Sequence, residues 1–146
     1  MISIVVFALP MLINIAYVLF PPTGEVSSSK SVTRRVEFIE AVSRIVYLVL
    51  LTFLVNKNPL KPKSIWLLAA VVFLFLYYIV WIRYFIGGRN IALLGQSLLF
   101  VPIPLAVFPV VYYLCAAIWM GNIPAVVAMS VFGAAHITVS IQSFCR

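Results

Sequence analysis

The side chains that could carry out acid, base or metal chemistry are few in this sequence. It contains three carboxylates, one histidine, two cysteines and no aspartate. Magnesium-dependent phosphoryl transfer, two-metal hydrolysis and glycoside cleavage all need carboxylates that converge on one site. Only Glu37 and Glu40 are placed to converge, and Cys115 and Cys145 each lie in an apolar stretch, where a thiol behaves as a small hydrophobe. We therefore predict no catalytic residue, no metal site and no cofactor.

The single histidine, His136, lies inside the apolar run 124–144. Polar side chains inside membrane helices usually face the interior of the bundle, so two interpretations of His136 are open. In the first, its imidazole forms one hydrogen bond to a facing group and only helps helices to associate. In the second, it lines a polar pocket for a small ligand together with Asn14 and with Tyr112 or Tyr113.

A second group of chemically interesting residues surrounds the start of the run 36–55. Glu40 and Arg44 are four residues apart, which places them on one helix face in the orientation that favours an ion pair. Arg44 could simply extend toward the interface and pair with Glu40. Alternatively, Glu37, Glu40, Arg44, Arg83 and Arg89 could gather on the cytoplasmic side as a site for an anion or a lipid head group.

The composition indicates whether these residues lie in water or in a membrane. Of the 146 residues, 65% are apolar and only 9% are charged, and the apolar residues form runs of about 19 to 30. About 20 apolar residues are enough for a helix to cross a bilayer. The net charge of +7 comes from basic residues between the runs, at the interfaces with water, which argues against nucleic-acid binding. The sequence predicts a membrane protein whose main partner is the lipid bilayer.

We expect one all-α transmembrane domain, 1–146, folded as a bundle of five spanning helices. The first run lacks the basic start and the small-residue cleavage site of a secretory signal, so we expect it to be a retained span. Prolines, glycines and charges separate the runs. The predicted spans are 2–20, 36–55, 64–86, 103–120 and 124–144.

The uncharged run 91–120 is too long for one upright span, so we expect it to be interrupted. Pro102, Pro104 and Pro109 mark the interruption, because each proline removes a helix hydrogen bond. We predict a short interfacial helix over 91–100, followed by a proline-kinked fourth span. The sequence Gly121-Asn122 predicts a tight turn into the fifth.

Five spans would divide nine of the ten basic residues, all except Arg44, six to three between the two sides. The excess of positive charge marks the cytoplasmic side. This places the N-terminus outside and the C-terminus in the cytoplasm, in the cell membrane.

The sequence favours a non-enzymatic protein that binds or transports a small solute or lipid-like ligand in an intramembrane pocket. An alternative is an accessory, scaffold or immunity-type protein, as a homo-oligomer or with a membrane partner, because span 124–144 is rich in small residues that let another helix approach. A third hypothesis is an enzyme that acts on a lipid head group at the basic cluster.

Overall fold

The computed structural model describes residues 2–23, 34–53 and 63–144. This part of the chain is all helical, with no strand. The helices are α1 (Ile2–Leu19), α2 (Arg34–Phe53), α3 (Ile65–Ile86), α4 (Ala92–Gly95), α5 (Pro104–Trp119) and α6 (Ile123–Phe144). The five long helices coincide with the predicted runs to within about two residues, the usual uncertainty of helix ends.

Three of these helices are long and apolar enough to cross a membrane: α1, α3 and the segment Ile123–Gln142 of α6. The helix α5 is equally apolar but has only 16 residues, or about 24 Å of length. The helix α2 begins with charged residues. The three apolar helices indicate a membrane location.

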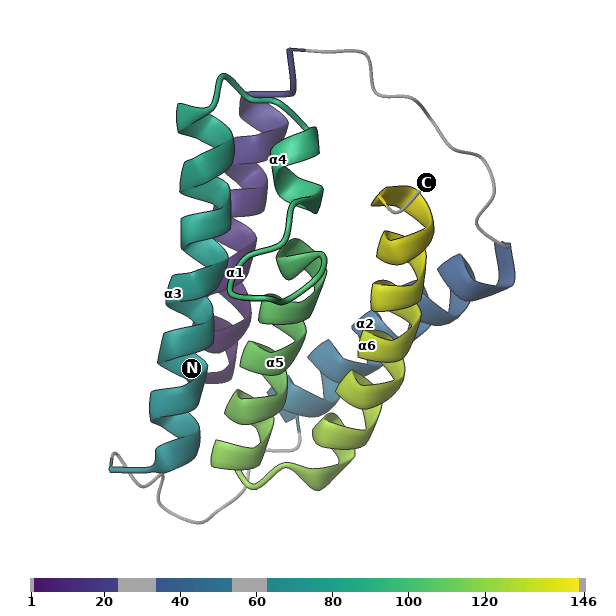
Figure 1. Cartoon of the computed structure of the whole chain (residues 1–146). Coiled ribbons are helices and arrows are strands. Elements are labelled where there is room, and N and C mark those ends of the chain that lie inside the picture. Colours follow the sequence, from purple (N-terminus) through teal and green to yellow (C-terminus); the bar gives the residue numbers. More distant parts are fainter. Residues whose placement is uncertain (1, 24–33, 54–62, 145–146) are drawn as a thin grey trace.

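The helices pack as neighbours in the order α3, α5, α6 and α2, while α1 touches α2, α3 and α5 (Figure 1). Helix α2 crosses α6 at a steep angle instead of running parallel to the others. Phe108, Tyr84 and Met129 are among the largest fully buried side chains of the interior. The arrangement brings five helices around one central volume.

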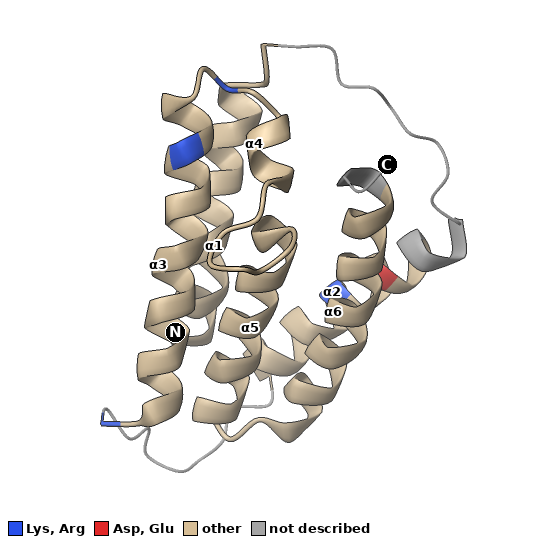
Figure 2. Cartoon of the chain, viewed as in Figure 1, with Lys and Arg blue, Asp and Glu red and all other residues tan. Residues whose placement is uncertain are grey.

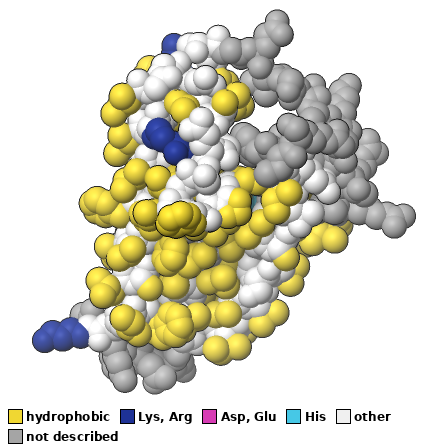
Figure 3. Space-filling view, in the orientation of Figure 1, with side chains coloured by type: hydrophobic (Ala, Val, Ile, Leu, Met, Phe, Trp, Pro, Cys, Tyr) yellow, Lys and Arg dark blue, Asp and Glu magenta, His cyan; other side chains and the backbone are white. Residues whose placement is uncertain are grey.

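The outer surface is apolar. Figure 3 shows hydrophobic side chains across most of the visible face, with basic side chains toward its two ends. In Figure 2 the charged residues that the structure describes lie near the ends of α3 and on α2. Large hydrophobic side chains such as Phe75 (69% exposed) point outward, as they would toward lipid.

The segment between α3 and α5 differs from the prediction. Helix α4 covers only four residues, so the interfacial helix predicted over 91–100 is wrong in its length. Leu99 and Phe100 have positive φ angles of 51° and 65°, a conformation that no helix of L-residues can continue. Pro102 and Pro104 do not kink α5: Pro102 precedes it, Pro104 opens it, and only Pro109 lies inside.

The turn between α5 and α6 is tight, as predicted, and Asn122 holds it in place. The Asn122 side-chain oxygen accepts a hydrogen bond from the Ala125 N–H at 3.1 Å, which caps the start of α6. Its amide nitrogen donates to the Leu50 carbonyl at 2.9 Å. Leu50 lies in the last turn of α2 that the structure describes. The Asn122 side chain therefore joins α2 to the start of α6.

We expect Asn122→Ala to lower the free energy of unfolding by about 1 kcal/mol, because the cap is lost. Asn122→Ser keeps an oxygen that can cap the start of α6, places no charge against the Leu50 carbonyl, and should cost less. The measurement is unfolding in mixed detergent micelles at increasing denaturing detergent. Equal losses in both variants would contradict a capping role.

Candidate functional site

A cavity of about 200 Å³ lies between the five long helices. Every one of these helices contributes to its wall. The lining residues are Phe7, Pro10, Met11, Asn14, Arg44, Tyr47, Tyr77, Trp81, Leu105, Ala106, Pro109, Tyr113, Met129, Phe132, His136 and Ser140.

Three of the residues predicted for a ligand pocket line this cavity: Asn14, Tyr113 and His136. The fourth, Tyr112, is not among the described lining residues. Its hydroxyl donates instead to the Val6 carbonyl at 2.8 Å. The cavity wall is otherwise mainly apolar and aromatic, with a few polar groups, which is the usual character of a small-molecule site.

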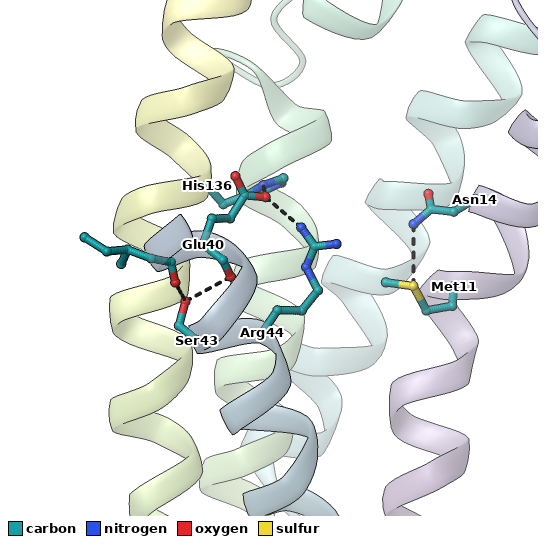
Figure 4. A network of polar contacts seen from close by, with 7 residues as sticks. Met11, Asn14, Glu40, Ser43, Arg44 and His136 are labelled. Carbon is teal, nitrogen blue, oxygen red and sulfur yellow. Dashed lines mark hydrogen bonds and ion pairs between the residues drawn. The ribbon is translucent and has the colours of Figure 1, made fainter. Parts of the chain in front are cut away.

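At one side of the cavity, α2 and α6 are joined by a polar network (Figure 4). The Arg44 guanidinium donates to Glu40 Oε1 at 2.8 Å, and His136 Nδ1 lies 3.0 Å from the same oxygen. The His136 ring stacks on the Phe132 ring, with 5.1 Å between the centroids. The Arg44 guanidinium lies over the same Phe132 ring, 5.6 Å from its centroid. One carboxylate therefore orients both a cation and an imidazole.

The predicted anion site is brought together only in part. Glu40 and Arg44 form the ion pair, whereas Arg83 on α3 donates to three carbonyls within the segment 93–97. Arg89 lies in the turn after α3, with a φ angle of 61°. The Glu37 side chain lies outside what the structure describes. Arg83 serves to tie α3 to the segment around α4.

On the other side of the cavity, Asn14 of α1 faces α3. The Tyr77 hydroxyl donates to the Asn14 side-chain oxygen at 2.9 Å. The Asn14 amide nitrogen lies 3.8 Å from the Met11 sulfur (Figure 4), and a thioether is a weak acceptor. The polar end of Asn14 is thus well paired at its oxygen and poorly paired at its nitrogen.

Two prolines inside helices, Pro10 of α1 and Pro109 of α5, also line the cavity. Each removes the helix hydrogen bond to the carbonyl four residues earlier, Val6 and Leu105 respectively. Tyr112 supplies a substitute donor to the Val6 carbonyl. Each helix therefore lacks one backbone hydrogen bond beside the same cavity, although both continue as helices through their prolines.

The small residues of α6 are mostly used within the chain. Ala125, Ala128 and Ala135 are buried. A Cβ on Gly133 would lie 2.5 Å from Val110 Cγ1, so α5 packs directly on this glycine. Ala134 is exposed. Most of the face predicted to receive a partner helix is occupied by α2 and α5.

Three aromatic lining residues with a polar group were not predicted as site residues: Tyr47, Tyr77 and Trp81. The sequence feature that could have identified them is their position within a span. A Tyr or Trp there lies away from the membrane–water interface, where the polar group of such a side chain usually sits. Among the described residues, no group of three or more His, Cys or Glu side chains could hold a metal ion.

No protein-family model, curated protein or solved structure matches this chain. Its site must be interpreted from its own geometry.

Proposed function

We propose that all five long helices cross the membrane and that the central cavity binds, or carries across the membrane, a small solute or lipid-like ligand. The composition of α1, α3 and α6 supports the membrane location. The short α5 is flanked by apolar segments and packs between α3 and α6. The charged start of α2 would lie near the interface, where water and head groups solvate it.

One observation carries the proposal: Asn14, Arg44, Tyr113 and His136 come from four different helices and line a single cavity. Polar groups are costly inside a membrane and are kept there mainly where they pair or serve a site. Gathering four of them around a cavity is more than helix association requires.

The distribution of basic residues supports a cell-membrane protein with its N-terminus outside and its C-terminus in the cytoplasm. The polar network of Glu40, Arg44 and His136 would then lie toward the cytoplasmic side, since α2 starts and α6 ends there.

Native mass spectrometry of the protein, released from its own membrane, tests the proposal. We expect a stoichiometric small molecule on the wild type. Its occupancy should fall about tenfold or more in His136→Ala, because a buried polar contact is lost. Thr138→Ala is the matched control: Thr138 is an exposed α6 residue whose hydroxyl bonds only within its own helix, to Ala134.

Ala106→Leu provides a second variant that leaves the network of Glu40, Arg44 and His136 intact. Ala106 is 1% exposed and lines the cavity, so a larger side chain would fill it. Retention of the ligand by Ala106→Leu would contradict the proposal. A wild-type spectrum with a partner protein and no small molecule would favour the accessory hypothesis instead.

A further inference from the structure

We propose that the ligand is an uncharged molecule, about as large as one substituted six-membered ring, whose oxygen accepts a hydrogen bond from the Asn14 amide. This inference rests on the proposed function and names the class of molecule that the cavity would select. It follows from the weakly paired donors, the charge balance and the size of the cavity.

The first argument is the state of Asn14. Its oxygen is taken by the Tyr77 hydroxyl, which fixes the amide so that the nitrogen points away from Tyr77. That nitrogen carries two hydrogens, and the Met11 sulfur at 3.8 Å is its only acceptor among the described residues. An amide with an unused donor beside a cavity favours a ligand that brings an acceptor.

The second argument comes from Trp81, which lines the same cavity and is 4% exposed. Its indole Nε1 is buried and interacts with the Tyr77 hydroxyl, but no acceptor in the described part of the chain lies in full hydrogen-bonding geometry. The ring stands edge-on to the Tyr77 ring, with 6.2 Å between centroids and an angle of 87°. An indole N–H is a donor only, so it adds a second weakly paired donor on the Asn14 side.

The third argument is charge. Among the described lining residues, Arg44 alone has a permanent charge, and Glu40 neutralises it at 2.8 Å. None of the described lining residues is a carboxylate. An anionic ligand would have to compete with Glu40 for Arg44, and a cationic ligand would find no counter-ion. Burying an unpaired charge is far more costly than burying a neutral polar group, so the site favours a neutral ligand.

The fourth argument is size and shape. An apolar cavity of about 150 Å³ accommodates benzene, and this one has about 200 Å³. The additional volume fits a short polar substituent. Most other lining residues are apolar, among them Pro10, Leu105 and Pro109, which suits an apolar ring. A neutral aromatic or alicyclic carbonyl compound meets all four conditions.

The experiment is fluorine NMR of the purified full chain in lipid nanodiscs, with para-fluoro derivatives of four ring compounds of similar size. They are acetophenone, cumene, benzoate and benzylammonium, and empty nanodiscs correct for partition into lipid. We expect the ketone to bind about fivefold more tightly than cumene, the gain from one net hydrogen bond. Both ions should bind about tenfold more weakly than the ketone, or worse.

Asn14→Leu, which keeps the approximate shape, should abolish the preference for the ketone over cumene. Leu12→Ala is the matched control and should keep the preference, since Leu12 lies on α1 but is 57% exposed and is not among the described lining residues. Equal binding of ketone and cumene to the wild type, or tighter binding of either ion, would overturn the inference while leaving the pocket standing. If all four compounds still bind to the Ala106→Leu variant, the proposed function fails as well.

Discussion

Replacing Gly133 by alanine is expected to lower the free energy of unfolding by about 1–3 kcal/mol, although alanine is the better helix former. The added Cβ would lie 2.5 Å from Val110 Cγ1, far inside van der Waals contact. Valine has one strongly preferred rotamer in a helix, so Val110 cannot swing away. The helices α5 and α6 would have to separate. Unfolding in mixed detergent micelles measures the loss.

Two further variants test this explanation. In the Val110→Ala background, Gly133→Ala should cost much less, because the clashing methyl groups are gone. The neighbouring Ala134 is exposed, and Ala134→Val should change stability by no more than about 0.5 kcal/mol. A stabilising effect of Gly133→Ala would show that α5 and α6 do not approach as closely as described.

The second large effect is expected for Tyr112→Phe, at about 1–2 kcal/mol of unfolding free energy. Pro10 has no N–H, so the Val6 carbonyl has no helical donor, and the Tyr112 hydroxyl at 2.8 Å takes that place. In the Pro10→Ala background the alanine N–H can bond to Val6. The same Tyr112→Phe change should then cost less than about 0.5 kcal/mol, so that a double-mutant cycle shows coupling.

Tyr113→Phe is the matched control for this prediction. The Tyr113 hydroxyl also donates to an α1 carbonyl, that of Phe7, at 2.9 Å. Residue 11 is a methionine with its own N–H, which can reach Phe7 along the helix. The loss on Tyr113→Phe should therefore be smaller than on Tyr112→Phe and insensitive to Pro10→Ala. Equal losses, or no coupling with Pro10, would contradict the explanation.

The helices were predictable because long apolar runs, prolines and charges mark their ends. The segment 91–103 was not, because its course depends on positive φ angles at Leu99, Phe100 and Ile103. Such angles are uncommon in residues other than glycine, and nothing in the amino-acid composition predicts them. The proline pair was misassigned for a related reason: Pro104 is as well suited to open a helix as to bend one.

Of the residues that line the cavity, the sequence singled out Asn14, Tyr113 and His136 for a pocket and Arg44 for an anion site, but not how the helices bring them together. A lone histidine and an asparagine in apolar spans stand out from the sequence, and the structure places both beside one cavity. The bond between His136 and Glu40 joins residues 96 apart in sequence, and it depends on how α2 crosses α6. Helices that are apolar on all sides do not reveal from sequence which face meets which neighbour.

The pairing of Val6 with Tyr112 also bears on how the chain is made. The two residues are 106 positions apart, so at ordinary rates of synthesis the ribosome reaches Tyr112 about 5 to 20 seconds after Val6. During that interval, an α1 inserted as proposed has a Val6 carbonyl without a hydrogen-bond donor, and the hydrocarbon of the bilayer supplies none. The nascent segment should therefore stay near the insertion machinery and its water until α5 arrives. Chains that stop before α5 would expose this polar defect to membrane proteases.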